Sequence, residues 1–197
     1  MRKSNREKIL TTARKQFLKY GYNGISIRSI AKLASMTTGG VYFHFKNKKE
    51  IYETICLEAI DILLGIIEEL EVKSKEPGKR LISVFDAYYK FYSEYKNHYN
   101  LFKEYQSNYI EGDPVRTDEV VERFKKVLNI MVDAVQEGID MGIFRNIDPK
   151  TTAFYLAAVS DGMFQLKNIG VSDSLGISVN DFRSFMISIT EKGIINS

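Results

Sequence analysis

Apolar side chains recur every three or four residues over most of the 197-residue chain, which is the period of an α-helix with one buried face. The three prolines, Pro77, Pro114 and Pro149, fall between these periodic segments and not within them. We therefore predict an all-α fold. The expected helices cover residues 4–20, 27–34, 38–45, 48–73, 78–109 (broken near Asn97 or Asn100), 115–141, 149–168 and 179–195.

Polar residues that cap helices mark several of the expected starts. Asp148 precedes Pro149, and proline at the first helical position loses no hydrogen bond because its missing N–H has no partner there. Two other pairs have the spacing of a capping box, in which cap and third residue bond each other's backbone N–H. These pairs are Asn47 with Glu50 and Ser178 with Asp181.

Two short helices near the amino terminus are separated by almost no chain. Ser26 and Thr37 occupy the capping positions of the helices expected over residues 27–34 and 38–45. Only two residues, Ser35 and Met36, lie between the first helix and the second cap, so the helices cannot run parallel. Apolar pairs at staple spacing support both starts: Ile25 with Ile30, and Met36 with Val41. The pattern predicts a helix-turn-helix.

Charge divides the chain into two parts of opposite sign. Residues 1–50 contain 12 lysines and arginines against 2 acidic residues, a net charge of +10, whereas residues 51–197 contain 16 against 23, a net charge of −7. A dense basic stretch joined to an acidic remainder is typical of a surface that binds a polyanion. Nucleic acid is the first candidate, and an anionic membrane surface is the second.

The predicted second helix of this motif contains two adjacent glycines, Gly39 and Gly40, within the segment TTGGVYFHF. Glycine weakens a helix by about 1 kcal/mol relative to alanine. A helix that enters the major groove of DNA gains from a bare backbone, because its surface can then approach closely. We interpret the glycines in this way, and we expect Gly40→Asn to alter operator preference more than stability.

Residues 6–52 resemble the amino-terminal domain of the tetracycline-repressor (TetR) family of transcription regulators. The resemblance rests on Arg6, Ala13 and Phe17 in the first helix, followed by ISIRSIAKLA and MTTGGVYFHFKNKKEIY in that order and spacing. It implies a three-helix DNA-binding domain at residues 1–47 and a larger helical effector-binding and dimerisation domain at residues 48–197. Where the family often has glycine in the turn, this chain has Ser35, for which we expect a left-handed, mildly strained conformation.

The resemblance also implies a set of DNA-contacting residues. Tyr42 is expected to direct its hydroxyl at a phosphate, and Lys48 to bind a phosphate at the start of the fourth helix. Core packing is the alternative for Tyr42 and the favoured interpretation for Phe45. For Phe43 core edge and DNA edge are equally favoured, and for His44 a structural role is favoured over base contact. The full expected set is Ser26, Arg28, Thr37, Thr38, Gly39, Gly40, Tyr42, Phe43, His44 and Lys48.

Aromatic residues are concentrated at residues 85–109, which hold seven of the twelve tyrosines. A tyrosine buried in a core needs a partner for its hydroxyl, so this group of aromatic residues would suit the wall of a ligand pocket. Packing in the hydrophobic core is nevertheless the favoured interpretation. A pocket of this kind would suit a flat or cationic ligand, with a fatty-acyl or other apolar ligand almost as well suited. The candidate lining is Tyr88, Tyr92, Tyr95, Phe102, Tyr105 and Phe164, with Glu94, Glu104 and Asp161 as candidate counter-charges.

The last two expected helices carry more apolar side chains than an exposed helical hairpin needs. In proteins that resemble this chain, the corresponding pair forms a four-helix interface between two subunits. A two-fold dimer also suits DNA, because paired recognition helices about 34 Å apart meet successive major grooves. We therefore expect a homodimer through residues 149–168 and 179–195.

Other classes of protein receive little support. The single cysteine, Cys56, is expected to be a buried thiol, and with only His44 and His98 there is no metal-ligand cluster, no cofactor motif and no catalytic constellation. An enzymatic function is therefore not expected. No apolar run approaches the roughly 18 residues that cross a bilayer, and the amino terminus does not resemble a secretory signal, so we expect a cytoplasmic protein.

These features predict a sequence-specific, DNA-binding transcription regulator, most simply a homodimeric repressor that an unidentified small molecule releases from double-stranded operator DNA. The alternative is a TetR-like DNA-binding protein without an effector, which organises DNA or recruits another protein. A titration in which no small molecule alters DNA affinity would favour this alternative.

Overall fold

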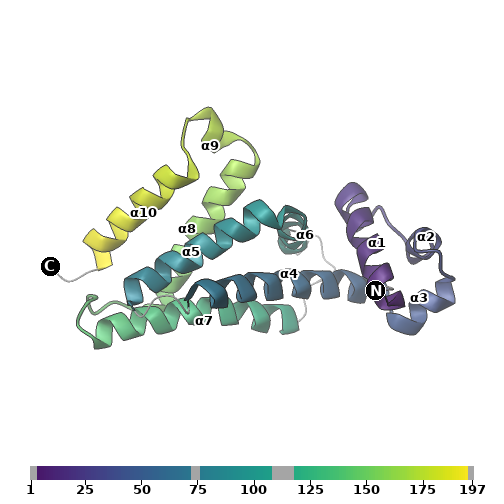
Figure 1. Ribbon diagram of the computed structural model, residues 1–197, viewed down its shortest axis with the longest axis horizontal. Helices are drawn as coiled ribbons and strands as arrows, with labels where there is room; N and C mark the ends of the chain where they lie inside the picture. The colour runs from purple at the N-terminus through teal and green to yellow at the C-terminus, as the bar shows by residue number, and fades with distance from the viewer. Residues whose placement is uncertain (1–3, 72–75, 108–117, 195–197) are drawn as a thin grey trace. The chain divides into compact units, whose positions relative to one another are not determined.

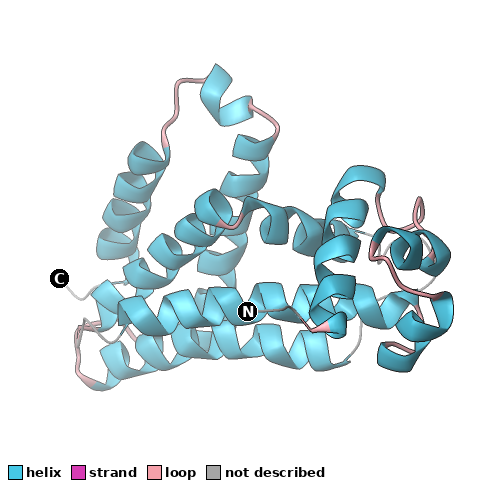
Figure 2. Ribbon diagram, turned by 45° about the vertical axis from the view of Figure 1, so that its right-hand side comes forward, coloured by secondary structure: helices cyan, strands magenta, loops and turns pink. Residues whose placement is uncertain are grey.

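The computed structural model describes residues 4–71, 76–107 and 118–194, and every element that these residues form is an α-helix (Figures 1 and 2). The all-α prediction is confirmed. The helices are α1 (Asn5–Tyr20), α2 (Ile27–Leu33), α3 (Thr38–His44), α4 (Lys48–Glu71), α5 (Pro77–Glu94), α6 (Lys96–Ser107), α7 (Asp118–Asp140), α8 (Pro149–Asn168), α9 (Val171–Ser174) and α10 (Val179–Ile194).

Two features of the helix order differ from the sequence-based expectation. The segment expected to break near Asn97 or Asn100 breaks at Tyr95, whose carbonyl oxygen accepts the N–H groups of His98 and Tyr99 in the first turn of α6 at 2.8 and 3.0 Å. The four-residue helix α9 was not expected, because one turn is too short to show an apolar period. The outer ends of several predicted helices, at residues 72–73, 108–109, 115–117 and 195, lie outside the described residues.

The chain forms two compact units. The first unit comprises residues 1–62 and 95–123, and the second comprises residues 63–94 and 124–197. Helix α4 therefore contributes residues to both units, as does α7. These two units are defined by packing and do not coincide with the domains expected from the sequence, residues 1–47 and 48–197. The domain boundary between residues 47 and 48 stays a prediction.

The core of the first unit joins α1 to α4 and α6. Phe17 is fully buried, as the apolar face of α1 predicts, and its ring meets the ring of Tyr52 edge-on at 4.9 Å. The ring of Tyr105 in α6 lies 6.0 Å from the ring of Tyr52. The Tyr52 hydroxyl donates to the carbonyl oxygen of Leu101 at 3.3 Å, and burial, together with the nearby Glu104 carboxylate, raises the pKa of Tyr52 well above its ordinary value.

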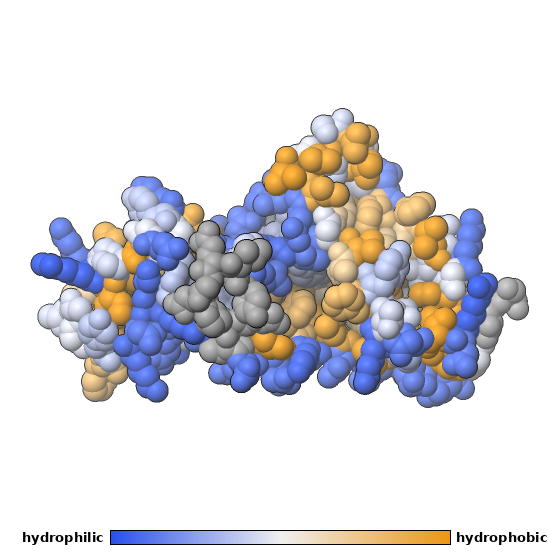
Figure 3. Space-filling model, turned by 180° about the vertical axis from the view of Figure 1, so that it is seen from behind, coloured by the Kyte–Doolittle hydropathy of each residue, from blue (hydrophilic) through white to orange (hydrophobic). Residues whose placement is uncertain are grey.

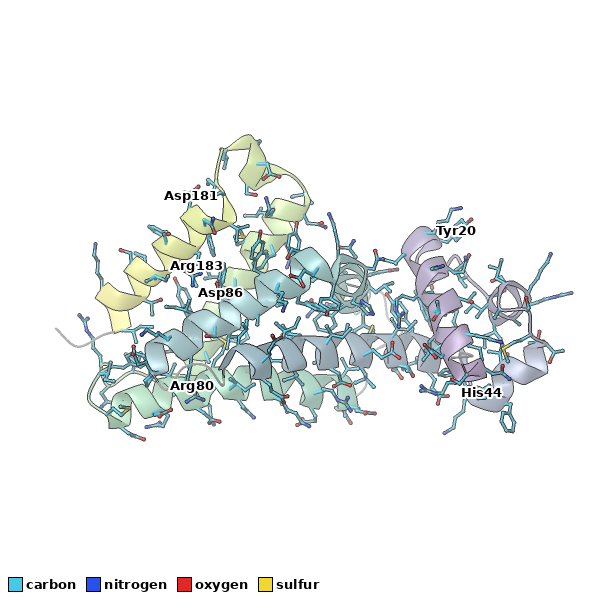
Figure 4. The ribbon with its side chains drawn as sticks, in the orientation of Figure 1. Tyr20, His44, Arg80, Asp86, Asp181 and Arg183 are labelled. Carbon is cyan, nitrogen blue, oxygen red and sulfur yellow. The ribbon has the colours of Figure 1, made fainter. Side chains whose placement is uncertain are left out.

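The core of the second unit is organised around Phe164 of α8, which is fully buried. The rings of Phe85 and Tyr92 in α5 stack on it at centroid distances of 5.6 and 5.1 Å. Beside this cluster Asp86 of α5 and Arg183 of α10 face each other, with two hydrogen bonds of 2.6 and 2.8 Å (Figure 4). Three helices of this unit are thus held together by aromatic packing and one bidentate ion pair.

The caps predicted at Asp148 and Ser178 are confirmed, whereas the capping box predicted at Asn47 forms in one direction only, because the Glu50 carboxylate accepts the Lys46 N–H at 2.6 Å. The Asp148 carboxylate accepts the Thr151 N–H at 2.6 Å, which lowers the pKa of Asp148. Ser178 and Asp181 form a reciprocal capping box with hydrogen bonds of 2.9 and 3.1 Å. Asn47 caps α4 by accepting the Glu50 N–H at 2.8 Å.

Candidate nucleic-acid interface

The second and third helices are joined by a turn that only a few residues can adopt. The N–H of Ser35 donates to the carbonyl oxygen of Lys32 at 3.2 Å, and the N–H of Met36 donates to that of Ala31 at 2.9 Å. These two bonds form a Schellman motif, which requires a residue with positive φ at the position of Ser35. Ser35 has φ of 56°, as expected, and it is the one non-glycine residue with positive φ among those described. The turn places the cap of α3 directly after α2.

Both helices of the motif begin with a side-chain cap. The Ser26 hydroxyl accepts the Ser29 N–H at 3.2 Å, and the Ser29 hydroxyl accepts the Ser26 N–H at 3.1 Å, which completes a capping box. Thr37 accepts the Gly40 N–H at 3.0 Å. These bonds stabilise two short helices, of which α3, with the sequence TGGVYFH, contains no strong helix former.

Helix α3 has one buried face and one exposed face. Val41 and Phe45, four residues apart, are buried, and Phe45 therefore belongs to the core, as favoured from the sequence. Tyr42 is 53% exposed and Phe43 is 85% exposed, so neither ring closes the three-helix core. The exposed face thus presents one phenol and one bare phenyl ring.

The two glycines of α3 have different surroundings. A Cβ atom on Gly39 would meet only the Thr37 hydroxyl oxygen at 4.0 Å, so the surface beside Gly39 is open. A Cβ atom on Gly40 would lie 3.2 Å from the same oxygen, which is the cap of the helix, and 3.5 Å from the Met36 methyl group. Gly39 leaves the exposed surface bare, and Gly40 makes room for the cap.

The remaining expected contact residues of this motif lie at its surface. Arg28, near the start of α2, is exposed, as are Thr37 and Thr38. His44 lies at the end of α3 (Figure 4) and is half-buried. Its ring meets the ring of Phe43 edge-on at 5.1 Å. Their direct roles in DNA contact stay predictions.

Lys48 has bonding partners that the sequence did not indicate. Its ammonium group donates to the carbonyl oxygens of Tyr22 and Ile25 at 2.8 and 3.0 Å and lies over the Tyr22 ring at 4.2 Å. Partial burial lowers the pKa of Lys48. The side chain therefore holds the segment between α1 and α2 against the start of α4, whatever contact it makes with a phosphate.

Glu104, proposed from the sequence as a counter-charge for a ligand, is also engaged with this segment. Its carboxylate accepts the Tyr22 N–H at 2.9 Å, which connects α6 to the end of α1 within the first unit. The two residues are 82 positions apart, and no local pattern indicates such a contact. Lys48 and Glu104 together fix the segment that leads into α2.

The structure divides the predicted pocket residues between the units. Tyr88, Tyr92 and Phe164 belong to the second unit, where the Tyr88 and Phe164 rings lie 5.4 Å apart. The Tyr88 hydroxyl donates to the Asp161 carboxylate at 2.6 Å. The other three residues belong to the first unit: Tyr95, Phe102 and Tyr105. The aromatic residues of this segment do not line the face of a single helix, because α5 ends at Glu94 and α6 begins at Lys96.

A hollow of about 390 Å³ lies elsewhere in the second unit, where the end of α8 and α9 meet the start of α10. The Tyr89 ring forms part of its wall, beside the ion pair of Lys167 with Asp173 at 2.8 Å. The rest of its lining comes from residues 176–180. No local sequence pattern indicates this hollow, because its lining comes from four helices, α5, α8, α9 and α10, and from the loop before α10.

Two negative findings concern the described residues alone. No three histidine, cysteine or acidic side chains among them are grouped as metal ligands. None of their helices has the length and apolar character to cross a membrane. Cys56 is buried, as predicted, and its burial raises the pKa of the thiol.

A capped helix-turn-helix with an exposed second helix in a strongly basic segment defines the class of DNA-binding transcription regulators. Residues 9–55 match the family model described as "Bacterial regulatory proteins, tetR family". The uncharacterized HTH-type transcriptional regulator YhgD of Bacillus subtilis is 27% identical over 78% of this chain and 81% of its own length. The HTH-type transcriptional repressor KstR2 of Mycolicibacterium smegmatis is 27% identical over 72% of this chain and 68% of its own length.

The fold extends the likeness beyond the amino-terminal motif. The crystal structure described as "a putative transcriptional regulator from Saccharomonospora viridis in complex with choline" has a TM-score of 0.79 at 19% identity over 98% of each chain. The helix-turn-helix region of this chain therefore matches the TetR family of bacterial regulatory proteins, and most of the chain is similar to HTH-type transcriptional regulators.

Proposed function

We propose that this chain is a homodimeric repressor that binds operator DNA through α3 and is released by a small-molecule effector. The observation that carries the proposal is the exposed face of α3, where Thr38, Tyr42 and Phe43 stand clear of the core on a helix held by its own caps. The segment around this face has a net charge of +10 over residues 1–50, which attracts a phosphate backbone.

We propose that some residues of the helix-turn-helix contact phosphates and that others contact the edges of bases. The hydroxyls of Thr37 and Tyr42 and the guanidinium of Arg28 would contact phosphates and set the position of α3 in the groove. Base recognition would fall to the exposed side chains of α3 itself. The bonds of Lys48 to two backbone carbonyls support a role in holding α2 in position, in addition to the phosphate contact that the family resemblance implies.

A second copy of the chain is the proposed partner of α8 and α10. These helices expose large apolar side chains, among them Phe154 at 66% and Phe185 at 63%. Apolar surface also gathers at the tip around α9, which includes Ile169 and Leu175 (Figure 3). Solvent-exposed patches of this kind are typical of subunit interfaces, and a two-fold axis would present two copies of α3 to successive major grooves.

The aromatic cluster of the second unit is the proposed effector region. Tyr88, Tyr92 and Phe164 supply stacked faces, and the Asp161 carboxylate supplies a negative charge that suits a flat or cationic ligand. The choline in the related structure from Saccharomonospora viridis supports a cationic ligand, and an acyl or other apolar effector remains the alternative. Helix α4 contributes residues to both units. We therefore propose that an effector binds one conformation of the protein more tightly than the other, and that α4 couples this conformational change to the helix-turn-helix.

A salt titration tests DNA binding itself. Duplexes are first enriched from a random-sequence library by the wild-type protein, and affinity is then measured by fluorescence anisotropy between 50 and 200 mM salt. We expect the logarithm of the binding constant to fall linearly and steeply with the logarithm of salt concentration, because phosphate contacts release counterions.

Thr38→Ala supplies the comparison in this experiment. We expect it to weaken binding to the enriched duplex while the protein keeps its secondary structure, because Thr38 is exposed. Salt-insensitive binding, or liposome binding that survives Thr38→Ala while DNA binding is absent, would contradict the proposal.

A further inference from the structure

Phe43 is the most exposed large apolar side chain among the described residues, at 85%. It lies in α3 between Tyr42 and His44, and the ring contact found for it is a T-shaped one with the adjacent His44 ring at 5.1 Å. An exposed phenyl ring contributes nothing to the core of the three-helix motif. A ring in this position is therefore available to a partner.

The surface next to Phe43 is shaped by the absence of a side chain. On a helix, a side chain leans toward the amino terminus and over the turn before it. For Phe43 that turn carries Gly39, four residues earlier, where an added Cβ atom would meet only the Thr37 hydroxyl oxygen at 4.0 Å. The exposed ring and the bare backbone of Gly39 thus lie one turn apart on the same helix face, with room beside Gly39 for at least a methyl group.

The chemistry of the major groove limits what this space can receive. A phenyl ring has no hydrogen-bond donor or acceptor, so it cannot read the polar atoms of guanine, adenine or cytosine. The apolar group that unmodified base edges present in the major groove is the methyl group on carbon 5 of thymine. A methyl group on carbon 5 of cytosine occupies the same position on the ring.

We propose that Phe43, with the bare surface of Gly39 beside it, reads the 5-methyl group of a pyrimidine in each operator half-site. The inference rests on the proposed function, since it requires α3 to lie in the major groove. It assigns sequence discrimination to a residue that makes no hydrogen bond to DNA. Tyr42 and the threonines would then supply position and affinity.

Removal of single methyl groups from the DNA tests the proposed contact with Phe43 directly. The full-length wild-type protein and Phe43→Ala are titrated with the duplex enriched by the wild-type protein, and with versions in which one thymine at a time is replaced by uracil, which lacks the methyl group. We expect one thymine per half-site at which uracil weakens wild-type binding about four-fold, equivalent to ~0.8 kcal/mol for one buried methyl group. Phe43→Ala should bind the two duplexes equally, which isolates the pairwise contact.

A second set of duplexes separates the two sources of the methyl group. Cytosines are replaced one at a time by 5-methylcytosine, and a gain in affinity that Phe43→Ala loses would assign the ring to 5-methylcytosine. Tyr42→Phe is the matched control, because it removes a hydroxyl from the neighbouring ring. It should weaken binding to all duplexes and keep the discrimination between thymine and uracil.

The outcomes are distinguishable. Enrichment of a duplex in which neither uracil nor 5-methylcytosine has an effect that depends on Phe43 would overturn the inference and leave the proposed function standing. Failure of the wild-type protein to enrich any duplex would overturn the proposed function and the inference with it. Circular dichroism checks that Phe43→Ala keeps its fold, which the exposure of the ring favours.

Discussion

Gly39 and Gly40 are adjacent residues of the same type, but an added methyl group would meet different surroundings at each. At Gly39 it would enter open space, and at Gly40 it would lie 3.2 Å from the Thr37 oxygen that caps α3. Substitutions at the two positions can therefore distinguish an effect on the stability of α3 from an effect on how closely α3 approaches DNA.

We expect Gly39→Ala to raise stability by up to about 1 kcal/mol, because alanine is the better helix former, and to weaken DNA binding, because the methyl group occupies the exposed face. Gly40→Ala should show little or no gain in stability, because the cap must shift. Urea unfolding and anisotropy with an enriched duplex measure the two effects. A loss of stability in Gly39→Ala would contradict this account.

That Gly40→Asn alters operator preference more than stability stays a prediction. The contact of an added side chain with the Thr37 cap adds a cost in stability.

Some single residues could be predicted from the sequence and others could not. Val41 and Phe45 share the buried face because they are four residues apart, which the sequence shows. Phe43 remained undecided from the sequence, since its exposure depends on how α1 and α2 cover α3. The partners of Lys48 and Glu104 lie 23 to 82 residues away and have no local signal.

At the scale of elements, the same helix ending recurs with different residues. Helix α7 ends with Gly142 N–H bonded to the Ile139 carbonyl oxygen and Ile143 N–H bonded to that of Gly138, both at 2.9 Å, and Gly142 has φ of 70°. Helix α2 has the same pair of bonds with Ser35 in the place of the glycine. A side chain at positive φ costs energy that glycine does not.

Ser35→Gly should therefore stabilise the protein by roughly 0.5–1 kcal/mol, the relief of backbone strain being partly offset by the greater freedom of glycine in the unfolded chain. The reverse change in the matching motif, Gly142→Ser, should destabilise it. Thermal and urea unfolding of both variants measure the difference. Equal effects of the same sign would show that the turn is not strained at Ser35.

Elements with a strong apolar period and a polar cap were predictable, and elements without them were not. The start of α8 at Pro149 follows from the cap and the proline alone. The sequence predicts this break near Asn97 or Asn100, two to five residues after Tyr95, because asparagine is a common breaker and tyrosine is not. Helix α9 was missed because it has only four residues.

At the scale of the whole molecule, the proposed dimer makes a prediction of its own. The exposed side chains of Phe154 and Phe185 are expected to be buried by a second copy, so the double variant Phe154→Glu with Phe185→Glu should be monomeric in analytical ultracentrifugation. Its affinity for the enriched duplex should fall strongly, because one copy of α3 reads only one half-site.

Met141→Glu is the control for added charge, because Met141 is also exposed but lies outside α8 and α10. It should keep the mass and the DNA affinity of the wild-type protein. A double variant that remains dimeric would place the interface on another surface. A monomeric variant with unchanged DNA affinity would remove the dimer from the mechanism of binding.

The helical fold, the helix-turn-helix, the basic charge of residues 1–50 and the resemblance to the TetR amino-terminal domain could all be predicted from the sequence, because periodicity, caps and charge are properties of neighbouring residues. The tertiary structure decided which rings stay in solvent, which carbonyls Lys48 holds, and how the aromatic residues at 88–105 divide between two units. These outcomes depend on packing between segments far apart in the chain. The local pattern of apolar and polar positions carries no information about such packing.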